Sequence, residues 1–171
     1  SMDPVHFEHL HGHYGNYINK KLGKPPAMKT PRHLKIDFDV FEYGVYKRRL
    51  VEGEPEDCDD WTVGHPILFP NTLAQLQDAY HSYQIRVPID DTHTMHVIIS
   101  FRGTEDGSEV VEAEPPAGYG KPFKDPADGT YPTARYLMDD VAAQDYMAWE
   151  TQGPVADRST ERLATSDHGV V

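Results

Sequence analysis

The sequence has a single cysteine, Cys58, among its 171 residues. One cysteine excludes an internal disulfide, a cysteine-rich zinc site and an iron–sulfur cluster held by this chain alone, and it favours a reducing cytoplasm. No run approaches the roughly 20 apolar residues of a membrane span, so no membrane partner is expected. Lys and Arg number 16 against 28 Asp and Glu, which gives a net charge of -12. Because phosphate binding needs clustered basic residues, no nucleic-acid partner is expected either.

Alternating apolar residues predict an antiparallel sheet as the core of one globular domain. The clearest pattern is a pair of strands, residues 80–88 and 94–101, joined by a hairpin loop. Another strand pattern runs through Phe41, Tyr43 and Val45. A short apolar strand at 66–71 contains two prolines, which predict an edge, a bend or a bulge there.

Outside these strands the pattern predicts loops and one clear helix. Residues 19–33 are rich in Lys and Pro and are expected to form an exposed loop. Residues 103–134 are rich in Gly and Pro, and such a long loop usually covers a site, reaches a partner or is disordered. A helical pattern at 136–151 ends before Gly153.

Four of the ten histidines fall in the first fifteen residues. Asp3 is suited to cap a helix there, Pro4 suits its first position, and Gly12 is expected to end it. Neutral imidazole is the commonest metal ligand in proteins, so the segment is a candidate metal site. A polar or tag-like surface run of histidines is the alternative.

Spacing alone does not choose the ligand pair. On a regular helix, His9 shares a face with His13 and with His6. His6 and His11 lie roughly 140° apart around such a helix, from about 3.6 residues per turn, and converge only if the helix loosens or ends. Two of these histidines and one carboxylate would form a facial triad typical of Fe(II) oxygenases, or a zinc site with the same ligands. The carboxylates available on the C-terminal helix are Asp139, Asp140, Asp145 and Glu150.

Several motifs in order resemble the catalytic domain of Rieske non-haem iron oxygenases, in the branch of phthalate dioxygenase and aromatic-acid O-demethylases. The resemblance covers nearly the whole chain. Its motifs are Asp3-x-x-His6-x4-His11, the hairpin Val87 to Thr94, Gln144-Asp145-Tyr146, Gln152-Gly153-Pro154, Asp157-Arg158-Ser159 and Ser166-Asp167.

The resemblance implies a role for particular residues. His6 and His11 match the two iron histidines, in place of a same-face pair, and Asp145 matches the carboxylate ligand. Asp3 matches the acidic residue that links the iron site to the Rieske cluster of a neighbouring subunit. If the Asp3 carboxylate accepts a hydrogen bond from the free ring N–H of His6, the basicity of the His6 imidazole is raised.

The resemblance also implies an α+β, helix-grip (START-like) fold, in which a curved antiparallel sheet packs on helices. A substrate cavity would lie beside the iron. Val97, Ile99 and Phe101 are candidates to line this cavity, although packing in the core is the more common role of such residues. Basic residues at Lys47, Arg48, Arg49 and Arg86 are candidates to pair with a substrate carboxylate, although basic residues on strands usually lie at the surface.

The implied activity is hydroxylation or O-demethylation of an aromatic (acid) substrate with O2 at Fe(II). Electrons would come from a [2Fe–2S] Rieske cluster that this chain cannot hold, supplied by a reductase or ferredoxin, in a homotrimeric parent. We therefore interpret residues 1–171 as a catalytic-domain fragment that lacks the Rieske domain and both ends. The alternatives are a helix-grip module that binds an apolar ligand without catalysis, and a zinc hydrolase.

Overall fold

The computed structural model divides the chain into two compact units. The helical unit is built from Ser1–His33, Val51–Gly53 and Tyr119–Asp167, and the sheet unit from Leu34–Leu50, Glu54–Gly118 and His168–Val171. The structure describes residues 4–26, 28–29, 31–77, 80–102, 123–125 and 135–169. Among these residues, no helix is both long and apolar enough to cross a bilayer.

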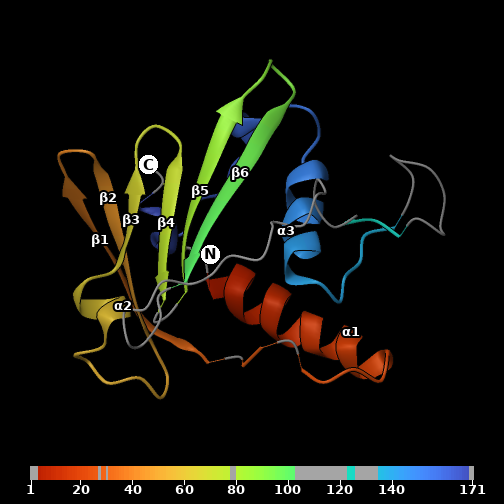
Figure 1. Ribbon diagram of the computed structural model, residues 1–171, viewed down its shortest axis with the longest axis horizontal. Helices are drawn as coiled ribbons and strands as arrows, with labels where there is room; N and C mark the ends of the chain where they lie inside the picture. Colours follow the sequence, from red (N-terminus) through yellow and green to blue (C-terminus); the bar gives the residue numbers. More distant parts are fainter. Residues whose placement is uncertain are drawn as a thin grey trace. The chain divides into compact units, whose positions relative to one another are not determined.

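The sheet has six strands that lie side by side in the order of the sequence (Figure 1). Successive strands from β2 to β6 pair antiparallel. The α+β expectation with a curved antiparallel sheet is therefore confirmed. The strands are β1 (His33–Phe41), β2 (Gly44–Val51), β3 (His65–Leu68), β4 (Thr72–Gln77), β5 (Tyr80–Pro88) and β6 (Thr94–Arg102).

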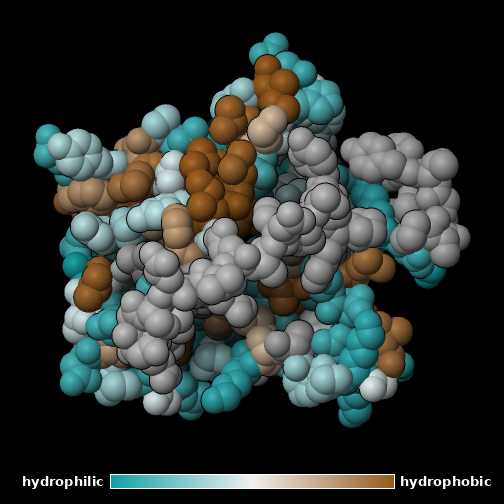
Figure 2. Space-filling model, viewed as in Figure 1, coloured by the Kyte–Doolittle hydropathy of each residue, from teal (hydrophilic) through white to brown (hydrophobic). Residues whose placement is uncertain are grey.

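The β5–β6 hairpin matches the sequence prediction. Tyr83 pairs with Ile99 and Ile85 pairs with Val97, so the alternating apolar residues of the two strands share one face. Exposed apolar side chains gather on this hairpin (Figure 2). Ile99 and Phe101 are 43% and 47% exposed, so the expectation that they pack in a core is wrong. Within the part of the chain that the structure describes, β6 is the last strand of the sheet.

The segment around Phe41 to Val45 is not one strand. β1 ends at Phe41, and β2 begins at Gly44 after a tight turn. Gly44 faces Leu68 across the sheet, and a Cβ at this glycine would lie 1.9 Å from the carbonyl oxygen of Ile67. The turn therefore depends on the missing side chain, whereas the alternation of aromatic residues across it suggested a continuous strand.

The N-terminal helix is longer than predicted and has an unusual geometry. A π-helix, η1 (Val5–Tyr14), continues directly into α1 (Gly15–Lys21). The helix therefore does not end at Gly12, and the predicted loop at 19–33 begins only after Lys21. Gly12 is buried inside the helix and does not end it.

The C-terminal helix α3 (Val141–Glu150) is shorter than the predicted 136–151 and packs against η1 (Figure 1). It begins at Val141 because Asp140 caps it: the Asp140 carboxylate accepts a hydrogen bond from the Ala143 N–H at 3.0 Å. The other short helices among the described residues are α2 (Asp59–Thr62), η3 (Arg158–Thr160) and η4 (Thr165–Asp167). Apart from residues 123–125, the predicted loop at 103–134 lies outside the described residues.

Candidate metal centre

The π-helix brings two histidines that are five residues apart onto one face. In a π-helix the backbone hydrogen bonds join residues five apart, as the Gly15 N–H does with the carbonyl oxygen of Leu10. One turn therefore separates His6 from His11, and their Nε2 atoms lie 2.8 Å apart. The sequence predicted that His6 and His11 converge only if the helix loosens or ends, and the π-helix is such a loosened helix.

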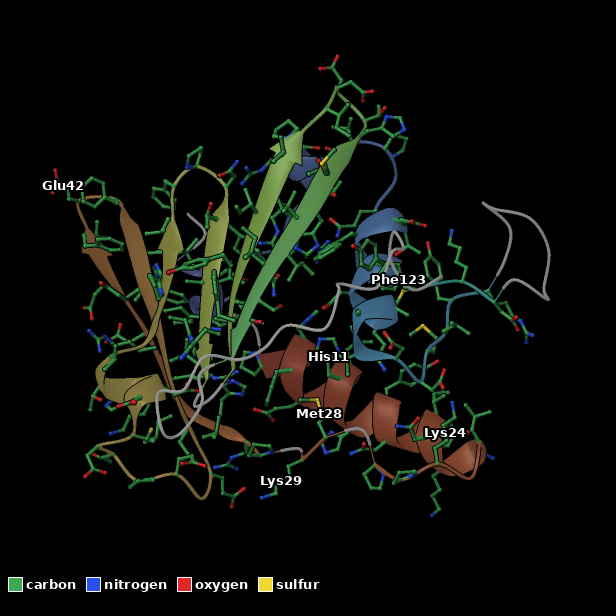
Figure 3. All side chains as sticks on the ribbon, viewed as in Figure 1. His11, Lys24, Met28, Lys29, Glu42 and Phe123 are labelled. Atoms are coloured by element: carbon green, nitrogen blue, oxygen red, sulfur yellow. The ribbon has the colours of Figure 1, made fainter. Side chains whose placement is uncertain are left out.

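Asp145, on α3, completes a cluster of three side chains that could hold a metal ion. Its Oδ1 lies 2.9 Å from His6 Nε2 and 3.1 Å from His11 Nε2. His11 is buried, whereas the side chains of His6 and Asp145 are 23% and 29% exposed. Among the described residues this is the one group of three His, Cys, Asp or Glu whose ligand atoms lie close enough to hold an ion. Figure 3 shows His11 on the N-terminal helix, near the lower end of α3 in this view.

The three donor atoms lie close enough together to hold a single ion. The three observed separations are 2.8, 2.9 and 3.1 Å. Two imidazole nitrogens and one carboxylate oxygen are a donor set that could hold a metal ion.

Gln144 supports His11 from the side away from the cluster. His11 Nδ1 lies 2.8 Å from Gln144 Oε1. The Gln144 amide in turn donates to the carbonyl oxygen of Met138 at 2.8 Å. Gln144 is completely buried and Gly15 packs against it: a Cβ at Gly15 would lie 2.9 Å from Gln144 Nε2. The sequence reasoning gave neither residue a role at the site, although Gln144 directly precedes Asp145 in the motif Gln144-Asp145-Tyr146.

The electrostatics of the cluster favour an ionised Asp145. Burial raises the pKa of Asp145, but hydrogen bonds from His11 and His6 outweigh burial and hold the pKa well below its usual range. Burial lowers the pKa of His11, but hydrogen bonds to Asp145 and Gln144 outweigh burial, so that the pKa of His11 is raised from its usual value. The carboxylate is therefore in the charged form that a metal ion needs.

The other histidine pair of the N-terminal helix lies apart from this cluster. His9 and His13 approach each other at 3.2 Å between their Nδ1 atoms, on the exposed side of the helix. Among the described residues they take no part in a group of three metal-binding side chains. The structure thus brings His6 and His11, and not His9 and His13, to the carboxylate.

The remaining candidate carboxylates have other partners. Asp139 pairs with Lys24, and Asp140 caps α3. Glu150 pairs with Lys124 at 2.7 Å. Asp3 lies outside the described residues, so its expected contact with His6 stays a prediction.

The basic residues of β2 bind other parts of the protein. Arg48 pairs with Asp39, and Arg49 Nε lies 2.8 Å from Asp60 Oδ2. Asp60 Oδ1 also lies 2.9 Å from His65 Nε2, so this carboxylate joins α2 to β2 and β3. Lys47 is 4% exposed, so the expectation that it lies at the surface is wrong.

On β5, Arg86 donates to Gln84. A role of these basic residues toward a substrate therefore stays a prediction.

Comparison with known proteins places the cluster in context. The chain is 36% identical over 99% of its length to the 5,5'-dehydrodivanillate O-demethylase oxygenase subunit of Sphingobium sp. (strain SYK-6), and it covers 37% of that protein. It is 28% identical over its whole length to the phthalate 4,5-dioxygenase oxygenase subunit of Pseudomonas putida, of which it covers 44%. No protein-family model matches the chain. The chain therefore spans less than half of each of these relatives.

These relatives are the two kinds of enzyme that the sequence motifs indicated, an O-demethylase and a phthalate dioxygenase. The similarity extends over the helix with His6 and His11, the hairpin and α3, since it covers essentially the whole chain. Over its own length, this chain is a homologue of part of the oxygenase subunits of such enzymes.

Proposed function

We propose that the chain carries the mononuclear iron site of an oxygenase that oxidises an aromatic substrate with O2. The observation that carries the proposal is the convergence of His6 Nε2, His11 Nε2 and Asp145 Oδ1 within 3.1 Å of one another. Two imidazoles and one carboxylate with open positions are the donor set typical of non-haem Fe(II) oxygenases. The O-demethylase relative, at 36% identity, supports O-demethylation over ring hydroxylation as the reaction.

The three side chains divide the site into a closed and an open side. His11 is buried, and its ring is held from behind by Gln144, so water is excluded there. His6 and Asp145 are partly exposed, which leaves their side for the aromatic substrate and O2. Fe(II), when bound by this donor set, supplies redox chemistry and coordination positions open to O2.

Electron supply follows from the family resemblance. The single Cys58 cannot provide the two cysteines of a Rieske [2Fe–2S] cluster, so the proposed electron source lies outside this chain. Asp3 is the proposed link between that cluster and His6. The same proposal includes a reductase or ferredoxin partner, a homotrimeric parent and a cytoplasmic location.

The experiment is metal analysis of the chain, purified without a histidine tag and loaded anaerobically with Fe(II) or Zn(II). We expect one Fe(II) per chain, lost in Asp145→Ala. Asp139→Ala is the matched control, because Asp139 precedes the same helix but pairs with Lys24. Preferential binding of Zn(II) with hydrolytic activity would support the hydrolase instead, and no metal binding at all would leave only a ligand-binding module.

A further inference from the structure

We propose that Gln144 is the positioning residue that presents Nε2 of His11 to the metal. The hydrogen bond from His11 Nδ1 to Gln144 Oε1 would fix both the orientation of the ring and the nitrogen that carries its proton. The inference rests on the proposed function, because the choice between the two nitrogens of His11 matters for function only when one of them binds the metal.

The carbonyl oxygen of Met138 determines which end of the Gln144 amide faces His11. A backbone carbonyl can only accept a hydrogen bond, so the group 2.8 Å from it must be the NH2 of Gln144. The amide oxygen must then face His11 at 2.8 Å. Because that oxygen can only accept, His11 Nδ1 must carry a proton, and the lone pair needed for a metal is left on Nε2.

Burial makes this arrangement stringent. Gln144 is completely buried and His11 is 5% exposed, so neither can replace a lost partner with bulk water. A reversed amide would place the oxygen of Gln144 against that of Met138 and an NH2 against the Nδ1 proton. Both contacts would be repulsive, so a single orientation is stable.

Gly15 provides the space that this arrangement needs. A Cβ at Gly15 would lie 2.9 Å from Gln144 Nε2, which is closer than non-bonded carbon and nitrogen atoms normally approach. Gly15 has ordinary helical angles, with φ of -57°, so the glycine is not required by the backbone. Its place in the helix is explained by the close approach of the Gln144 amide.

Residue 144 requires both a donor and an acceptor, and glutamine is the long side chain that offers them together. Leucine would fill a similar volume and remove both hydrogen bonds. Glutamate would still accept from His11 but would place a carboxylate oxygen against the Met138 carbonyl. Comparison of Gln144→Leu with Gln144→Glu therefore separates the effect of the hydrogen bond to His11 from the effect of the hydrogen bond to the Met138 carbonyl oxygen.

The test measures Co(II) binding and the exchange of imidazole protons in the whole chain. Co(II) is the probe because its visible absorption reports binding, and because it shifts the N–H signals of bound imidazoles out of the crowded NMR region. We expect one slowly exchanging Nδ1–H signal from His11 in the unmodified chain and in Gln144→Glu. Gln144→Leu should lose this signal to fast exchange and bind Co(II) about 10- to 100-fold more weakly.

Two further variants sharpen the result. Gly15→Ala should displace the amide and reproduce part of the Leu effect on exchange. Gln152→Leu is the matched control: its amide also donates to a backbone carbonyl, that of Ala148 at 2.9 Å, but on an exposed site. It should change neither exchange nor affinity. An Nδ1–H signal and a Co(II) affinity that survive in folded Gln144→Leu, as judged by circular dichroism, would overturn the inference.

A metal-free measurement separates this inference from the proposed function. At acidic pH, where His11 carries a proton on both nitrogens, its Nδ1–H should be protected from exchange by Gln144 and exposed by Gln144→Leu. If the unmodified chain binds no Co(II), the proposed metal site fails, whereas the metal-free spectra still decide whether Gln144 holds His11. Equal exchange in both metal-free proteins would reject the role of Gln144.

Discussion

The imidazole rings of His6 and His11 stand edge to face, with centroids 4.3 Å apart and planes at 85°. This contact joins residues five apart, which a π-helix allows and a regular α-helix does not. The other pair, His9 and His13, has the α-helical spacing of four and lies on the exposed side at 5.1 Å between centroids. One helix thus presents two imidazole pairs, and the pair near Asp145 is the one with the less common spacing.

Removal of single histidines should distinguish the two pairs. His6→Ala and His11→Ala should each abolish stoichiometric Fe(II) binding, because each removes one of three donors at 2.8–3.1 Å. His9→Ala and His13→Ala should leave the iron content unchanged. The measurement is iron per chain after anaerobic loading and desalting. Equal losses from all four substitutions would indicate loose chelation by the histidine-rich segment.

Lys47 should give the protein a distinctive pH dependence. Burial lowers the pKa of Lys47 to about 8, assisted by the positive charge of Arg49 and opposed by Asp60. Between this value and the usual pKa of 10.5, the unfolded chain holds a proton that the folded chain has released. The contribution of Lys47 to the free energy of unfolding should therefore rise with pH across this window.

The substitution Lys47→Met should remove that rise and stabilise the protein by about 1–3 kcal/mol at pH 7, where the buried charge is fully present. Urea unfolding at several pH values between neutrality and the usual lysine pKa measures both effects. Lys35→Met, at an exposed site paired with Glu56, is the control and should leave the pH dependence intact. An unchanged slope in Lys47→Met would contradict the assignment.

Two glycine substitutions should differ sharply. Gly44→Ala should destabilise the sheet by about 3 kcal/mol, since its Cβ would meet the Ile67 carbonyl oxygen at 1.9 Å and force β2 and β3 apart. Gly53→Ala has open space around the new methyl group, and its positive φ of 93° should cost only about 1 kcal/mol. Thermal unfolding of both variants tests the difference; equal losses would show that the close approach at Gly44 is not the cause.

Loss of the cap on α3 should lower stability and weaken the candidate site. Asp140→Ala removes the acceptor of the Ala143 N–H and should cost about 1 kcal/mol. Because α3 carries Gln144 and Asp145, Fe(II) affinity should fall too. Asp157→Ala removes a similar cap from the exposed turn η3 and should change stability by less than about 0.5 kcal/mol. Chemical denaturation and Fe(II) titration give the two readouts.

Much of the sheet was predictable from local pattern, because each apolar alternation reports which face a strand presents. The β5–β6 hairpin followed directly from this signal. β4 was missed, because Thr72, Ala74 and Gln75 dilute its apolar pattern. The turn before Gly44 was missed for another reason: it depends on a contact with Ile67, more than twenty residues away in the sequence.

The candidate site was predictable only with the family motif. Local spacing on a regular α-helix pairs His9 with either His13 or His6 and so left the ligand pair open, and it did not distinguish Asp145 from its neighbouring carboxylates. The π-helix that selects His6 and His11 leaves no clear sequence signal. The link from His11 through Gln144 to Met138 was not predictable either, because it joins residues more than 120 positions apart.

The π-helix also has a consequence for insertions and deletions. Shortening the segment between His6 and His11 by one residue would give them the spacing of four that keeps side chains together on an ordinary α-helix. Lengthening it by one would carry the second imidazole past Asp145 and away from Gln144. Among natural variants of this segment, deletion of one residue should therefore be compatible with iron binding, whereas insertion of one residue should not.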